Sequence, residues 1–170
     1  IAAEMEYSFW HALIRDVAYG QIPRSARAAK HEAAADWLEQ MAGERMADHA
    51  DLLAHHTTEA LALARAAGGP SDPKLEVRAA QYLVLAGDRA WMLHVTAATA
   101  RYRQALELLP TGSEEHGLTL LKLAETAQAQ GRFEDARSHA EAAASELEAV
   151  GAARSAAQAF SLLGNVYFQL

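Results

Sequence analysis

Alanine dominates the sequence, and this bias is what most restricts the folds open to the chain. Its 170 residues include 41 alanines and 21 leucines, whereas valine and isoleucine together number nine. Alanine and leucine favour helices, while the β-branched and aromatic residues that favour strands are scarce here. Aromatic residues make up only 7% of the chain. The composition therefore predicts an all-α fold of closely packed helices and argues against a β-sandwich, a barrel or a doubly wound sheet.

Prolines divide the chain into segments of helical length. Proline breaks a helix interior because its ring clashes with the preceding turn and it donates no backbone hydrogen bond. Each of the four prolines lies between periodic apolar stretches rather than inside one: Pro23, Pro70, Pro73 and Pro110. We therefore predict eight helical segments, the last one incomplete: about 8–21, 24–42, 45–67, 73–92, 94–109, 114–130 and 133–149, and another that opens near 152.

Several predicted helix ends carry residues suited to them. Asp72 and Ser113 stand just before predicted helices, where a short polar side chain accepts hydrogen bonds from free N–H groups of the first turn. Gly131 and Gly151 lie where one helix ends and the next begins, a position that favours glycine. Because the connections are short, we expect sequential helices to pack antiparallel.

A pattern of small and bulky residues recurs along the second half of the chain. In each unit a bulky residue is followed by leucine and a small residue three and four positions on. In the first two units a second helix then carries further small and bulky residues, whereas the third unit stops before its second helix. Three units follow it: Tyr82, Leu85, Ala86, Ala98, Tyr102, Ala105 and Pro110; Leu120, Leu123, Ala124, Ala136, Ala140 and Ala143; and Phe160, Leu163, Gly164 and Tyr167. The pattern resembles the tetratricopeptide repeat, which implies a right-handed superhelix of antiparallel helix pairs, an α-solenoid.

The N-terminal residues carry a second and more specific pattern. Residues 9–19 read Phe-Trp-His-Ala-Leu-Ile-Arg-Asp-Val-Ala-Tyr. They resemble the Phe-x-His-Ala-Leu-Ile-Arg-Asp/Glu-Val-Ala-Tyr segment of bacterial STAND-type signalling ATPases, which include class III adenylate/guanylate cyclases with a fused ATPase and LuxR-type transcriptional regulators. Further stretches are similar to that family: Pro23-Arg24, the helix around His31, and residues 35–39, 51–56 and 82–90.

The resemblance implies a domain plan and a role. Residues 1–22 would be a helical segment that follows an ATPase and winged-helix core, residues 23–72 the linker helices of an arm, and residues 73–170 the tetratricopeptide-like repeats, the last one incomplete. The phosphate-binding Gly-x-x-x-x-Gly-Lys-Ser/Thr loop is missing from the sequence, so the nucleotide chemistry of the family is not carried over. The resemblance thus implies a non-catalytic, cofactor-free arm that binds a protein or peptide partner and relays a signal to an ATPase core in cis.

Two other functions stay open at this point: a free-standing tetratricopeptide-repeat adaptor or scaffold, and a helical enzyme. The enzyme is disfavoured because no serine stands in a recognisable nucleophile motif with a histidine and an acid. A net charge of −7 argues against a general nucleic-acid surface. The absence of cysteine removes thiolate sites and agrees with a cytoplasmic location. No uncharged run is long and apolar enough to span a membrane, and a chain that begins at Ile1 is expected to be a processed or excised piece.

Candidate binding residues follow from the repeat pattern and from the family resemblance. In the repeat architecture the first helix of each pair lines a concave groove, which predicts a partner-binding surface of Trp91, Leu121, Lys122, Glu125, Gln128, Asn165 and Phe168. Trp91 and Phe168 have a second interpretation, packing within or between repeats. The resemblance implies that His11 and Arg15, which share a helix face, contact the ATPase core. Pairing within the helix, with Asp16 nearby, is the alternative.

His49, His55 and His56 form the densest group of histidines. Spacings of six and seven residues separate His49 from the other two by about 9–10.5 Å along a helix axis. That is too far for one metal ion without a third element, so no metal site is predicted. Arg24, Arg27 and Lys30 form a basic stripe without interleaved aromatic residues, which is typical of a solvated face or of one that meets an acidic neighbouring domain.

The last segment presents an apolar face without the second helix of its repeat. That face is predicted to consist of Phe160, Leu163, Tyr167 and Leu170. Exposed apolar faces of this kind usually find a partner. We therefore expect the isolated chain to self-associate through this end, or a following repeat to cover it.

Overall fold

The computed structural model describes residues 12–70 and 72–170, and in that part of the chain every element is a helix. The α-helices are α1 (Ala12–Gln21), α2 (Arg24–Ala42), α3 (Ala50–Ala66), α4 (Pro73–Trp91), α5 (Val95–Leu106), α6 (Glu114–Ala129), α7 (Phe133–Ala149) and α8 (Ala153–Gln169). A 3-10 helix, η1 (Gly43–His49), connects α2 to α3. The predicted all-α fold is confirmed.

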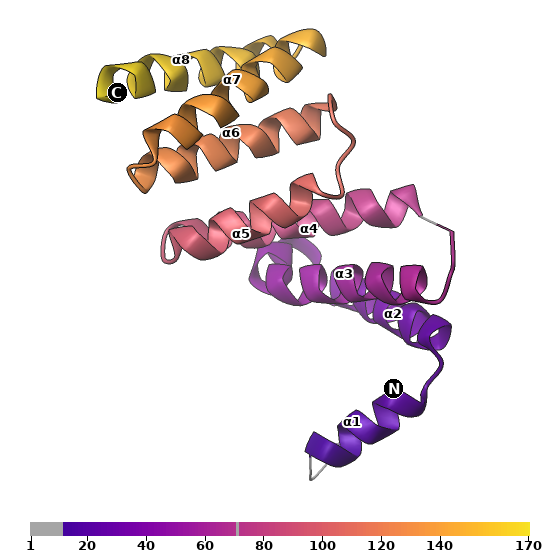
Figure 1. Ribbon diagram of the computed structural model, residues 1–170. Helices are drawn as coiled ribbons and strands as arrows, with labels where there is room; N and C mark the ends of the chain where they lie inside the picture. Colours follow the sequence, from indigo (N-terminus) through magenta and orange to yellow (C-terminus); the bar gives the residue numbers. More distant parts are fainter. Residues whose placement is uncertain (1–11, 71) are drawn as a thin grey trace.

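Helices α2 to α8 stack one against the next and run in alternating directions, while α1 projects from one end of the stack (Figure 1). The short connections explain this order, because a helix that reverses within a few residues packs against the one before it. One predicted boundary is wrong. Residues 45–49 belong to η1, where Arg45 has non-helical backbone angles, and α3 begins only at Ala50.

Local signals fix the helix ends where they were expected. The Asp72 carboxylate accepts hydrogen bonds from the backbone N–H groups of Lys74 and Leu75, at 2.9 and 3.4 Å. The Ser113 hydroxyl accepts one from the N–H of His116 at 3.1 Å. Each cap satisfies a donor that the first turn of a helix leaves free.

Small residues occupy the contacts between paired helices. All seven alanines of the repeat pattern are at most 1% exposed: Ala86, Ala98, Ala105, Ala124, Ala136, Ala140 and Ala143. Larger side chains fill the spaces beside them, and Leu83, Leu123 and Leu147 are almost fully buried. The core therefore extends along the stack as a series of clusters instead of gathering at one centre.

Gly87 marks the closest approach of two paired helices. A methyl group at Gly87 would overlap the ring of Tyr102, which is 2% exposed and lies on α5. The Tyr102 hydroxyl donates a hydrogen bond of 2.7 Å to Asp88 on α4. The absence of a side chain at Gly87 thus allows a large aromatic residue to be buried directly against the α4 backbone.

Candidate functional site

The predicted groove residues lie on helices that the structure connects through polar contacts. Lys122 of α6 pairs with Asp88 of α4, with 2.6 Å between Nζ and Oδ1. Gln128 of α6 donates a hydrogen bond of 3.1 Å to Gln169 of α8. The side chains of α6 on this face therefore contact both α4 and α8. We call this surface, with Asp88, Lys122, Glu125, Gln128 and Gln169, the α4–α6–α8 face.

A small charge network organises the middle of the α4–α6–α8 face. The Lys122 ammonium lies 5.8 Å from the centre of the Tyr102 ring and shares Asp88 with the Tyr102 hydroxyl. Burial raises the pKa of Tyr102, and its hydrogen bond to Asp88 acts in the same direction. Desolvation also raises the pKa of the Glu125 carboxyl, with Lys122 opposing and Asp88 adding to the shift. The network holds Lys122 in a defined position beside two acidic groups.

The predicted groove residues differ in how much of each side chain reaches solvent. Leu121 is only 6% exposed and packs into the core between α6, α7 and α8, so it lines no surface and that prediction needs correction. Trp91 is partly buried against the cluster of Ala98, Tyr102 and Leu123, as in its second interpretation. Phe168 is 94% exposed, and Asn165 is also exposed. The reason for the Leu121 error is that helices cover α6 on several sides, which leaves only a narrow solvent-facing strip.

A cavity of about 190 Å³ opens beside Lys122, between α4 and α6. Its walls are mostly apolar and include residues that the sequence did not single out: Ala80, Gln81, Val84, Leu109, Glu115, Leu118 and Thr119. Leu118 is one helical turn before Lys122, so a search of that turn would have found it. A pocket with an apolar floor and a cation at its edge suits an apolar side chain carried next to an acidic or polar group.

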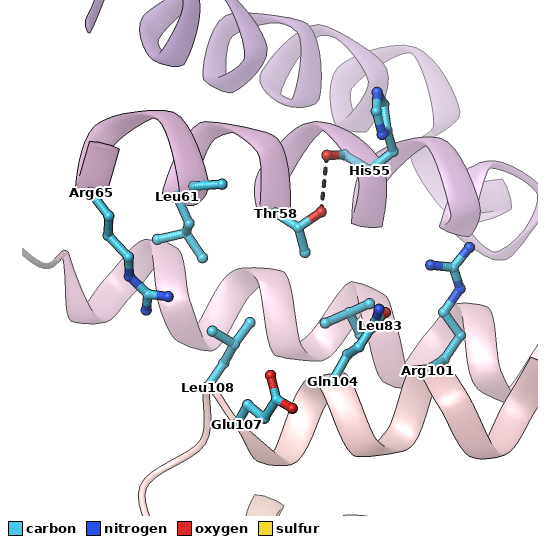
Figure 2. Close-up of a pocket in the computed structure, with 10 residues that line it drawn as sticks. His55, Thr58, Leu61, Arg65, Leu83, Arg101, Gln104, Glu107 and Leu108 are labelled. Carbon is cyan, nitrogen blue, oxygen red and sulfur yellow. Dashed lines mark hydrogen bonds between the residues drawn. The ribbon is translucent and has the colours of Figure 1, made fainter. Parts of the chain in front are cut away.

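A larger cavity of about 300 Å³ lies between α3, α4 and α5. Figure 2 shows Leu61, Leu83 and Leu108 inside it, with Arg65 and Arg101 at opposite ends. Both arginines already have acidic partners, since Arg65 bonds to Glu76 at 2.7 Å and Arg101 to Asp51 at 3.1 Å. Their charges are therefore largely compensated, which weakens the case for an anion site.

The expected contact to an ATPase core falls only partly within the described structure. His11 lies outside the described residues. Arg15 is exposed, and its guanidinium donates two hydrogen bonds, of 2.9 and 2.8 Å, to the neighbouring Asp16. This is the alternative of pairing within the helix. The apolar side chains of α1 are also exposed, with Leu13 at 77% and Val17 at 59%.

The histidine cluster in the structure differs from the group of His49, His55 and His56 that the sequence pointed out. His49 stands at the start of α3 and takes no part, whereas His31 of α2 lies next to His55 and His56 of α3. The three imidazoles each offer a nitrogen within 4.8 Å of the others. From the sequence, a further element was required to bring enough histidines together for one metal ion, and α2 is that element. No periodic pattern connects residues 31 and 55, so only the packing of α2 on α3 reveals the cluster.

The final segment also differs from expectation at one residue. Leu163 is 8% exposed and belongs to the core, because it lies on the side of α8 that packs against α6 and α7. Phe160, Tyr167 and Leu170 are between 51% and 56% exposed. The exposed apolar strip of α8 therefore consists of Phe160 and Tyr167, with Phe168 and Leu170 at its end.

Comparison with known proteins adds no family to this description. No protein-family model matches the chain, and no curated protein matches it significantly. Among the described residues, no helix has both the length and the apolar character that a bilayer crossing requires.

Proposed function

We propose that this chain is the non-catalytic, tetratricopeptide-like arm of a bacterial STAND-type signalling ATPase of the cytoplasm. In this proposal the arm binds a protein or peptide segment and relays that binding to an ATPase core in cis. The observation that carries the proposal is the α4–α6–α8 face, on which a mostly apolar cavity lies beside Lys122. A surface shared by alternate helices of a stack is where repeat proteins bind extended partners.

The packing of small residues supports the solenoid part of the proposal. The buried alanines of α4 to α7 lie at the positions that the repeat pattern assigns to helix contacts. A right-handed superhelix of such pairs would turn the first helix of each pair toward a common concave side. Asp88, Lys122 and Gln128 stand on α4 and α6, two of those first helices.

The exposed side chains of α1 support the contact to a core domain. Leu13, Ile14 and Val17 are all more than half exposed, an arrangement that an isolated surface helix does not need. In the STAND-type resemblance this helix adjoins the ATPase and winged-helix core. Burial of these side chains against that core would connect the arm to the nucleotide-dependent part of the protein.

A peptide-selection experiment tests the binding role. Peptides selected from a random library on the immobilised chain should bind less well to Val84→Glu and Leu118→Glu, because a charge in the apolar cavity must be desolvated. Gln104→Glu serves as the matched control, since Gln104 is exposed in the other cavity. If the selected peptides bind all three variants equally, the α4–α6–α8 face is not the binding surface.

The relay role has its own test in the parent gene and in nucleotide hydrolysis. We expect a Gly-x-x-x-x-Gly-Lys-Ser/Thr loop in the coding sequence upstream of Ile1, and no hydrolysis of ATP or GTP by the present chain alone. Real hydrolysis by this chain would overturn the non-catalytic assignment. An upstream sequence without such a loop would favour the free-standing adaptor.

A further inference from the structure

Three histidines converge where α2 packs on α3, and we propose that they bind a divalent transition-metal ion of the Zn²⁺ class. His31 comes from α2, and His55 and His56 come from α3. One nitrogen of each imidazole lies within 4.8 Å of the others. This proposal does not depend on the proposed function, because the cluster lies apart from the α4–α6–α8 face.

The separations are close to those of a metal centre. Zinc binds imidazole nitrogen at about 2.0–2.1 Å, so two ligands of a tetrahedral ion stand about 3.4 Å apart. The Nδ1 atoms of His31 and His56 are 2.9 Å apart, in a hydrogen bond that an ion between them would replace. The centre of the His55 ring lies 5.8 Å from that of His31 and 5.2 Å from that of His56. Because His55 is exposed, its ring can turn toward the other two without displacing packed atoms.

Tyr19 orients His31, the ligand from α2. The Tyr19 hydroxyl of α1 is 2.8 Å from His31 Nε2. When Nε2–H donates to that hydroxyl, the Nδ1 lone pair of His31 points toward the cluster, and this is how outer partners commonly fix a metal-binding imidazole. The Arg27 guanidinium lies 4.8 Å from the centre of the Tyr19 ring and helps to hold it. Tyr19 is therefore a positioning residue.

The charges around the cluster suit a cation that binds neutral imidazoles. Burial lowers the pKa of His31 and of His56, which favours the uncharged ring, the form that binds metals. The negative charge of Glu59 acts on His31 and would partly offset a bound cation, while Arg27 acts in the opposite direction. Three nitrogen ligands select Zn²⁺, Ni²⁺ or Cu²⁺ over Mg²⁺ and Ca²⁺, which prefer oxygen.

A bound ion would connect three helices at this end of the stack. It would join α2 to α3 directly, through ligands on both helices. Through Tyr19 it would also restrain α1, whose residues from 13 to 21 are exposed. The ion would therefore act as a structural clamp on the helix that, in the proposed function, faces a core domain.

Zinc titration of the tag-free chain tests the proposal. Zn²⁺ alone, followed by calorimetry or by competition with a chromogenic chelator, should bind one equivalent at micromolar concentration. His31→Gln and His56→Gln should each weaken binding at least tenfold, and Tyr19→Phe should weaken it about tenfold with an unchanged circular dichroism spectrum. His49→Gln, a histidine of the same region outside the cluster, is the matched control and should bind Zn²⁺ like the unmodified chain. Co²⁺ should give the visible absorption of a tetrahedral site.

Two results would overturn the proposal. One is the absence of saturable Zn²⁺ binding at micromolar concentration. The other is one-equivalent binding that His31→Gln leaves unchanged, because the ion would then lie elsewhere. His55→Gln provides a variant at an exposed position, so that loss of binding is separated from loss of folding. Loss of binding in His55→Gln with an intact helical spectrum supports the site.

Discussion

At the scale of single residues, the close packing of the helices depends on glycine at particular positions. Gly87 gives Tyr102 room against α4, and Gly117 does the same for Leu147, whose Cγ would lie 2.9 Å from an added methyl group. Gly164, in contrast, has no atom within 4 Å of such a methyl group. A side chain at Gly87 or Gly117 would therefore clash with a neighbour, whereas one at Gly164 would not.

Replacing Gly87 with alanine should destabilise the fold even though alanine favours helices. The substitution gains about 1 kcal/mol of helix propensity, but overlap with the buried Tyr102 ring costs about 1–3 kcal/mol, and more where backbone must move. We expect a net loss of about 1 kcal/mol or more in the free energy of unfolding, measured by urea denaturation. Gly164→Ala, the control in open space, should instead gain about 0.5–1 kcal/mol. Equal effects of the two variants would contradict this account.

His139 makes the stability of the fold depend on pH. Burial lowers its pKa, and Arg103 and Arg132 add to the shift while Asp135 opposes it. Between the ordinary histidine pKa of about 6.5 and the lowered pKa of the folded state, the unfolded chain therefore binds a proton that the folded chain does not. The free energy of unfolding should fall as the pH drops below about 6.5, by at most about 1.4 kcal/mol per pH unit for this one group, until the lowered pKa of the folded state is reached.

His139→Gln should reduce that slope, as measured by urea denaturation at several pH values. At pH 8 the titration of His139 should contribute nothing to the difference between the two proteins, since both states are then uncharged at this residue. His94→Gln, at an exposed histidine before α5, is the control. A slope that His139→Gln does not change would show that this group contributes no pH dependence.

At the scale of helices, side-chain caps act at the ends of some helices, while packing against other helices holds α2 to α8 in place. Asp72 and Ser113 cap α4 and α6 through their own side chains, whereas α5, α7 and α8 begin without a side-chain cap. These uncapped helices are held by packing, α5 and α7 on both neighbours along the stack and α8 on α7 and α6. Helix stability in proteins comes mainly from such packing, with caps adding a local share.

The two serines at positions 113 and 161 allow a matched test of the cap on α6. Ser113→Ala removes the hydrogen bond to the His116 N–H and should cost about 1 kcal/mol in the free energy of unfolding. Ser161→Ala makes the same chemical change at an exposed interior position of α8 and should gain a few tenths of a kcal/mol, roughly, from helix propensity. Thermal denaturation of both variants measures the difference. A Ser113→Ala variant as stable as the unmodified chain would rule out the cap.

At the scale of the whole molecule, the stack buries its core but leaves apolar surface on its terminal helices. On α8 the exposed strip includes Phe160 and Tyr167, while Ala156, Ala159 and Val166 face the core. A stack of this kind has two end surfaces, and an uncovered apolar end favours association.

The isolated chain should therefore self-associate through α8. Sedimentation velocity should show a weight-average mass that rises with protein concentration, and Phe160→Ser combined with Tyr167→Ser should reduce that rise. Met92→Ser, at an apolar side chain that is 83% exposed elsewhere on the surface, is the control. A chain that stays monomeric at high concentration, or a Met92→Ser variant with the same effect, would contradict the prediction.

Much of the architecture was predictable because it depends on local physics. The prolines, the caps at Asp72 and Ser113, and the positive-φ glycines at Gly131 and Gly151 act within a few residues of themselves. The start of α3 was misplaced because nothing local in residues 45–49 marks the change from a 3-10 helix to an α-helix. Leu121 was misassigned because helical periodicity identifies a face but not how many neighbours cover it.

The sequence by itself determined the helices, their turns and the small residues at their contacts, since propensity, capping and periodicity all operate over short separations. Only the tertiary structure decided which distant residues meet. His31 reaches His55 and His56 because α2 packs on α3. Val84 and Leu118 line one cavity because α4 and α6 both border it. The physical reason is that such meetings depend on how each helix is rotated and shifted against the next, and the packing of the whole chain sets both.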